Sequence, residues 1–173
     1  MKKLLLIAFV CITTISFSQS ESDITFIRNI VEQTNLHLKD YNSSFLKNNE
    51  LTSVEGNETI VFTEELNKIR LIKESFFGET GKTIIWNYFN DKQPIFIFKE
   101  YFKYKLPISN KNFNKNDFTK NEERFYLKNN RIIRWMKDKK IVKKYPTNAA
   151  DIENNMLQHI NSLVTKFEQE NIE

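Results

Sequence analysis

Five segments of aromatic and β-branched residues, separated by turns, constrain the fold of this chain more than any other feature. Each segment has the composition of a strand, and its neighbours are rich in residues that tolerate a tight reversal of the backbone. The segments are Lys68–Phe77, Lys82–Phe89, Pro94–Tyr104, Glu122–Lys128 and Arg131–Lys137. The turns at 78–81, 90–93 and 129–130 are short, and short turns force antiparallel pairing. The sequence therefore predicts an antiparallel meander.

Weaker segments extend this meander to five or six strands. Residues Glu58–Phe62 fit a short strand or a turn, and Lys139–Tyr145 fit a last edge strand. The polar residues 42–58 and 105–121 are expected to be loops. Residues 78–83 end in Gly-Lys-Thr like a phosphate-binding loop, but only two residues separate the glycines where that motif needs four, so a hairpin turn is predicted.

Apolar stripes with helical spacing flank the meander. Residues 22–41 predict a first helix, and residues 148–168 predict a closing helix capped by Thr147 or Asn148, with Asp151 in its first turn. The predicted fold class is α+β: an N-terminal helix, an antiparallel meander of five to six strands, and a C-terminal helix packed on the sheet. The simplest packing puts one or both helices on one face.

The strand at 94–104 is apolar on both sides where it begins. Ile95 and Ile97 alternate with Phe96 and Phe98. We therefore expect this strand to be central and covered on both faces, or to face a cavity.

Residues 1–18 predict a cleaved signal peptide, because two lysines precede an apolar run of about nine residues and a small, polar cleavage zone. A membrane-spanning helix needs about 20 apolar residues, so none is expected after cleavage. The expected product is a single domain, residues 19–173, that is periplasmic or secreted. Cys11 is the only cysteine, so the mature chain would have no thiol for disulfides, catalysis or metal binding.

The charge of the chain is nearly balanced once this segment is removed. The formal net charge is +4, and Lys2 and Lys3 contribute two of the positive charges. The sequence has 21 Lys and 5 Arg, the opposite of the preference for Arg in base and phosphate recognition. Nucleic acid is therefore not an expected partner.

Two segments of the meander repeat one pattern, an aromatic strand, an Asn-rich turn, and an aliphatic and aromatic strand. They are Trp86–Phe98 and Arg124–Trp135. The pattern over residues 66–137, together with the Ser-Phe-Ser-Gln ending of the predicted signal, resembles small exported proteins of unknown function from Bacteroidota-type bacteria. This resemblance implies export and supplies no catalytic residues.

No catalytic or metal-binding motif is evident in the sequence. His37 and His159 lie in different predicted helices and are expected to be structural. Neighbouring carboxylates on one strand point to opposite faces, so only a pair from separate strands, such as Glu74 with Glu100, could form a hydrolytic site. No cofactor, metal or catalytic residue is predicted.

The aromatic and basic side of the meander is the predicted binding surface. Its candidate residues are Trp86, Tyr88, Tyr126, Arg131, Arg134, Trp135 and Lys140. They suit an envelope glycan, a lipid headgroup or a partner protein. The basic run 131–144 is better explained as an edge strand protected by lysines than as a ligand site. The sequence favours a non-enzymatic binding module, and the alternative is a cofactor-free hydrolase with a cross-strand carboxylate site.

Overall fold

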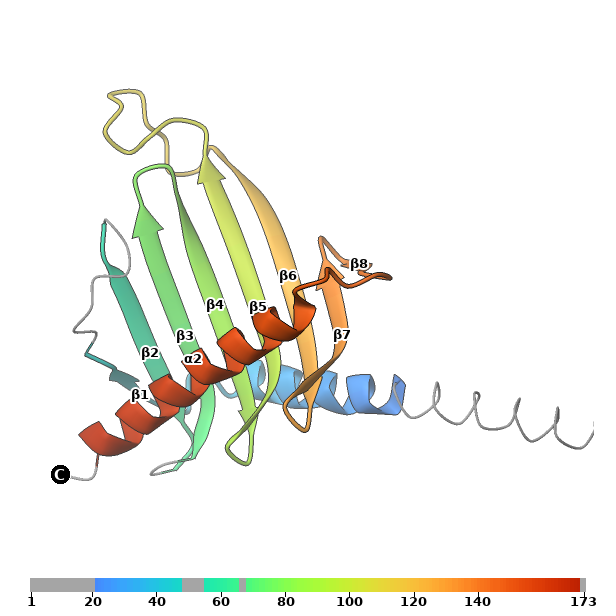
Figure 1. The fold of residues 1–173 in the computed structure, drawn as a ribbon. Helices are drawn as coiled ribbons and strands as arrows, with labels where there is room; N and C mark the ends of the chain where they lie inside the picture. Colours follow the sequence, from blue (N-terminus) through green and yellow to red (C-terminus); the bar gives the residue numbers. More distant parts are fainter. Residues whose placement is uncertain (1–20, 48–54, 66–67, 172–173) are drawn as a thin grey trace, which may run out of the picture.

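A computed structural model describes residues 21–47, 55–65 and 68–171 of the chain. A helix over residues 21–36 is followed by eight strands and a second helix (Figure 1). The labelled elements are β1 (Asn42–Phe45), β2 (Asn57–Thr63), β3 (Ile69–Gly78), β4 (Gly81–Asn90), β5 (Gln93–Tyr104), β6 (Phe118–Lys128), β7 (Arg131–Lys137), β8 (Lys140–Ile141) and α2 (Ala149–Glu170). The predicted signal peptide, residues 1–18, lies outside the described residues.

The strands form one antiparallel sheet in the order of the chain, from β1 to β8. The predicted α+β class is therefore confirmed, with eight strands where five to six were expected. The additional strand β1 lies in the segment predicted as a loop and pairs with β2. Its four residues, Asn-Ser-Ser-Phe, are all exposed, so no alternation of apolar and polar residues revealed it.

Two further boundaries differ from the prediction, and one predicted capping contact is absent. Strand β6 begins at Phe118, inside the segment predicted as a loop, because its first residues are exposed and polar. Strand β8 has only two residues, since the chain leaves the sheet after Ile141. Helix α2 begins after Asn148 as predicted, but the Asn148 side chain makes no capping hydrogen bond.

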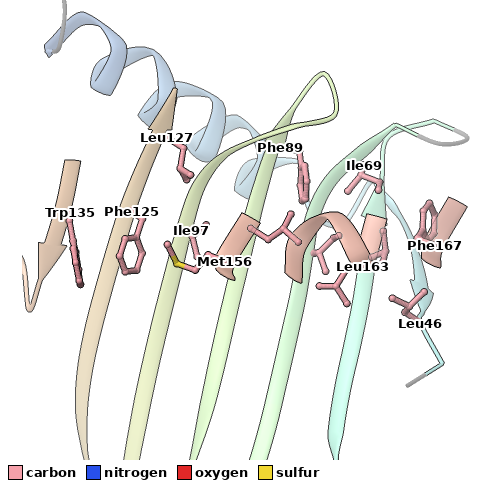
Figure 2. Close-up of a cluster of buried hydrophobic side chains, with 13 residues drawn as sticks. Leu46, Ile69, Phe89, Ile97, Phe125, Leu127, Trp135, Met156, Leu163 and Phe167 are labelled. Carbon is pink, nitrogen blue, oxygen red and sulfur yellow. The ribbon is translucent and has the colours of Figure 1, made fainter. Parts of the chain in front are cut away.

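The two helices lie on opposite faces of the sheet, as Figure 1 shows, so of the packings left open by the sequence, the one with both helices on the same face does not occur. Ile97 on β5 packs with the side chains of α2, and its neighbour Phe96 packs with those of helix 21–36. Because successive strand residues point to opposite faces, each central strand contributes side chains to the apolar clusters on both faces of the sheet. Of the two alternatives for strand 94–104, a central strand covered on both faces is the one found, and the cover extends over its apolar beginning, residues 94–97. Figure 2 shows the cluster beneath α2.

Three hairpin turns have both central residues at positive φ, the geometry that matches the twist of paired strands. These residues are Asp91 and Lys92, Asn129 and Asn130, and Asp138 and Lys139. The turns predicted at 90–93 and 129–130 are thus confirmed. The Gly-Lys-Thr segment also forms a hairpin, since β3 ends at Gly78 and β4 begins at Gly81.

Both helices cross the same half of the sheet and leave the other half uncovered (Figure 1). On β5, residues 94–97 are buried, whereas the residues from Phe98 onward are half-buried or exposed. On β4, burial is confined to Asn87, Tyr88 and Phe89, at the other end of the strand from Gly81. The strands near the β3–β4 turn therefore present side chains to solvent on both faces.

Candidate functional site

A row of four side chains crosses the sheet on the same face as helix 21–36, at the border between the cluster beneath the helix and the uncovered half of the sheet. Lys73 on β3 pairs with Trp86 on β4, Trp86 with Phe98 on β5, and Phe98 with Arg124 on β6. Directly paired residues in an antiparallel sheet share a face, so the four side chains lie next to one another. We call these four residues the cation–aromatic row.

In the cation–aromatic row, each cation lies over the nearer ring. The Lys73 ammonium lies 5.0 Å from the centroid of the Trp86 ring. The Arg124 guanidinium carbon lies 5.0 Å from the centroid of the Phe98 ring. Such contacts stabilise partly exposed pairs by about 0.5–1 kcal/mol each. They also hold the cationic groups at the surface while the rings stay half-buried.

The next row along the strands is acidic. Glu100 on β5 pairs directly with Glu122 on β6. Trp86 Nε1 donates to Glu100 Oε2 at 3.1 Å, and Lys120 Nζ lies 3.0 Å from Glu100 Oε1. Arg124 forms an ion pair with Glu122 at 2.8 Å. Beyond the two carboxylates, Lys82 and Lys120 both lie near the ring of Phe102, so donors and acceptors alternate over this surface.

A groove of about 440 Å³ lies where helix 21–36 meets this surface. It is lined by Arg28, Val31, Glu32, Asn35, Leu36, Phe96, Arg124 and Tyr126. Arg28 Nε donates to the Tyr126 hydroxyl at 3.5 Å, and its guanidinium carbon lies 5.8 Å from the centroid of that ring. Arg124 belongs to both the groove and the cation–aromatic row, so the two features are continuous.

Four of the predicted binding residues lie on this face. Trp86 is half-buried in the cation–aromatic row, and Tyr126 forms part of the groove. Tyr88 is buried beneath helix 21–36, its hydroxyl donates to Asn35 at 3.0 Å, and burial raises its pKa. Arg134 forms an ion pair with Glu21 of the helix.

The other three predicted residues lie elsewhere. Trp135 is buried beneath α2, on the opposite face of the sheet. Arg131 forms an ion pair with Glu153 of α2 at 3.0 Å, and Lys140 is exposed on β8. The seven residues therefore do not form one surface.

The basic run 131–144 lies at the edge of the sheet, on β7 and β8. Glu153 Oε2 accepts the backbone N–H of Ile132 at 2.6 Å, so a side chain of α2 occupies a hydrogen-bonding position of β7. With Arg131 and Arg134 paired to acids, this arrangement supports the edge-strand interpretation of the run.

The carboxylate pair suggested from the sequence does not form. Glu100 lies on the face of helix 21–36, whereas Glu74 points to the opposite face, where it contacts α2. Glu74 is buried and accepts hydrogen bonds from Asn87 at 2.9 Å and from His159 at 2.6 Å. The hydrogen bond to Glu74 raises the pKa of His159.

The two histidines do not meet. His37 is exposed and lies 3.0 Å from Asp40, beside helix 21–36, whereas His159 lies on α2 across the sheet. Over residues 21–47, 55–65 and 68–171, no group of three or more His, Cys, Asp or Glu side chains could hold a metal ion. Over the same residues, no helix is long and apolar enough to cross a membrane.

Sequence reasoning missed Lys73, Phe98, Arg124 and Arg28 as members of one site. Counting residues back from the β3–β4 turn places Lys73 opposite Trp86. This half of the cation–aromatic row could therefore have been predicted from the sequence. The long β5–β6 connection hides the register that brings Arg124 beside Phe98. Arg28 carries no local signal, because its place depends on how the helix packs.

Comparisons with protein-family models, with curated proteins and with solved structures each find no match for this chain. The geometry of the site is therefore the basis for a functional proposal.

Proposed function

We propose that the protein is a non-enzymatic binding module of the cell envelope and that its ligand is an envelope glycan. The observation that carries this proposal is the cation–aromatic row, in which Lys73 and Arg124 lie over the half-buried rings of Trp86 and Phe98 at the border of the cluster beneath helix 21–36. The location in the envelope rests on the signal peptide predicted at residues 1–18.

A glycan suits the chemistry of this surface better than a lipid does. Sugar hydroxyls both donate and accept hydrogen bonds, and the surface offers cationic donors beside the acceptor Glu100. The half-buried rings of Trp86, Phe98 and Phe102 offer apolar area to the C–H faces of a sugar. A lipid chain would gain nothing from acceptors set among the rings.

The test is a titration of the purified protein with defined oligosaccharides, followed by calorimetry. Soluble peptidoglycan fragments, uronic acid oligomers and neutral glucose oligomers are the probes. Trp86→Ala is expected to lower the affinity for the bound glycan at least about tenfold, since loss of a ring and its cation contact removes about 1.4 kcal/mol or more. Lys73→Ala is expected to lower it less.

Two control variants lie on the opposite face of the sheet. Tyr101→Ala removes an exposed ring, and Lys137→Ala removes an exposed ammonium group. Both are expected to bind as the wild type does. The proposal is wrong if no probe binds, or if the control variants lose affinity as much as Trp86→Ala.

A hydrolase is the second candidate, because Glu100 and Glu122 are direct cross-strand partners on the same surface. Paired residues of this kind have Cβ atoms about 4.5–5.5 Å apart, and retaining glycosidases use carboxylates about 5–5.5 Å apart. Reducing-end assays on the bound glycan test this candidate. Cleavage that Glu100→Gln and Glu122→Gln both abolish would support it, and cleavage that survives in both variants would exclude it.

A further inference from the structure

We infer that the groove beside helix 21–36 binds the carboxylate of an acidic sugar, so that the ligand class is a glycan containing uronic acids. This inference rests on the proposed function and narrows its ligand. It follows from the charges, hydrogen-bonding groups and apolar walls of the groove, and from the continuity of the groove with the cation–aromatic row.

Two guanidinium groups approach the groove from different elements. Arg28 comes from the helix and Arg124 from β6. Arg124 is paired with Glu122, whereas Arg28 uses its Nε for the Tyr126 hydroxyl, lies over the ring of Tyr126 and acts at longer range on Glu21 of the same helix. Within the described residues, the terminal nitrogens of Arg28 make no hydrogen bond. The terminal nitrogens of Arg28 therefore remain as donors, and a guanidinium group suits a carboxylate because it can donate two parallel hydrogen bonds.

The remaining lining suits the rest of a sugar ring. Glu32 offers acceptors, and Asn35 offers its amide donors because its Oδ1 already accepts from Tyr88. Phe96 and the aliphatic side chains of Val31 and Leu36 supply apolar walls. Sites of this volume combine such walls with a few polar groups that fix the orientation of the ligand.

The charges around the groove suit a ligand with a single negative charge. Arg124 is already paired with Glu122, so Arg28 is the guanidinium left to meet a ligand, and Glu32 lines the same groove as an acid. A phosphate monoester carries a charge between −1.5 and −2 near neutral pH, about what a phosphoserine carries, and it would be repelled by Glu32. A singly charged carboxylate therefore suits this lining better than a phosphate monoester does.

Because Arg124 also belongs to the cation–aromatic row, an oligomer lying along the row places one of its sugars in the groove. The rings of Trp86 and Phe98 would contact the neighbouring sugars. The groove thus binds the carboxylate of the sugar. The cation–aromatic row supplies contacts to the sugar rings that do not depend on that carboxylate.

The test compares oligogalacturonate with its methyl ester, which has the same sugars without the negative charges. Alginate oligomers and a sugar phosphate complete the panel. The wild type is expected to bind the acid at least about tenfold more tightly than the ester, a difference of about 1.4 kcal/mol. Arg28→Gln is expected to remove this preference because it weakens binding of the acid much more than binding of the ester, and Arg28→Lys is expected to restore part of it.

Arg131→Gln is the matched control, because Arg131 is also a surface arginine and lies at the β6–β7 turn, paired with Glu153. It should keep the full preference for the acid. Equal binding of acid and ester by the wild type overturns the inference and leaves the proposed function standing. Tighter binding of the sugar phosphate than of any uronic acid also overturns it. If no glycan binds, the proposed function and the inference fail together.

Discussion

Glu74 is the most deeply buried acidic residue in the described part of the chain. Its carboxylate is only 1% exposed, and burying an isolated charge costs several kcal/mol. The cost is offset because Asn87 and His159 each donate to one of its oxygens. Since His159 belongs to α2, the same contacts also attach that helix to β3.

Because of the hydrogen bond between Glu74 and His159, we expect the stability of the protein to depend on pH. The pKa of His159 is raised in the folded protein by the hydrogen bond to Glu74, so the folded state holds the proton more tightly than the unfolded state does. The stabilisation is complete below about pH 6.5, the ordinary pKa of histidine, and is lost as the pH rises through the raised folded value. The free energy of unfolding should therefore fall as the pH rises above about 6.5.

His159→Gln is the reference for this measurement. Lys99 and Glu123 also face the pair and are present in both proteins, so the difference between the two proteins reports the loss of the His159 imidazole and its interactions. Denaturant unfolding at a series of pH values should give a stability difference that shrinks toward alkaline pH. A difference that is constant, or that grows, would contradict the assigned role of the pair.

At the scale of elements, the β4–β5 ladder depends on one residue without a side chain. A Cβ atom at Gly81 would overlap the backbone carbonyl of Phe102 on β5. Gly81→Ala is therefore expected to destabilise the protein by about 2 kcal/mol, within the range for overpacked sites. Urea unfolding measures the effect.

Gly78 provides a matched control within the same hairpin. A Cβ atom there would lie 3.5 Å from the carbonyl oxygen of Gly81, an ordinary contact. Gly78→Ala should change stability by less than about 0.5 kcal/mol, as most surface substitutions do. Equal effects of the two substitutions would show that the close approach of β4 to β5 is not what requires glycine.

The elements that the sequence predicts well are those whose signals are local. The Asn129–Asn130 turn and the strands beside it follow from residues that are adjacent in the chain. Strand β1 was missed because its exposed residues pair with β2 without burying an apolar side. The placement of the two helices on opposite faces could not be predicted from local signals either. The apolar stripe of a helix does not show on which face of the sheet the helix will pack.

At the scale of the whole molecule, the sheet separates two apolar clusters. Ile27 is buried with Tyr88 and Phe96 on one face, and Ile160 is buried with Ile97 and Phe125 on the other. The clusters share no members. Substitutions in one should therefore act independently of substitutions in the other.

The test of this independence is a double-mutant cycle. Ile27→Val and Ile160→Val should each destabilise the protein by about 0.5–1.5 kcal/mol, the usual cost of removing one buried methylene. The double variant should lose the sum to within about 0.5 kcal/mol in urea unfolding. A larger departure from the sum would mean that strain passes through the sheet from one cluster to the other.

The candidate site was only partly predictable because it is assembled from distant segments. Trp86 and Phe98 lie in one hairpin, and the sequence singled out Trp86 for its ring. Arg124 reaches Phe98 only through the register of β5 with β6, and Arg28 through the packing of the helix. Local composition reports which residues can bind a ligand, whereas long-range pairing decides which of them share a face.

Each strand of the sheet pairs with the strand beside it in the chain. Contacts between neighbours in sequence close small loops, which cost little entropy and form quickly. A chain that is synthesised from its N-terminus can therefore pack one strand after another against helix 21–36. The other face has no such early cover, since α2 is made last, and Ile72, Ile97 and Phe125 stay exposed until then. The interval before residues 149–170 arrive is when the growing chain is most prone to aggregate.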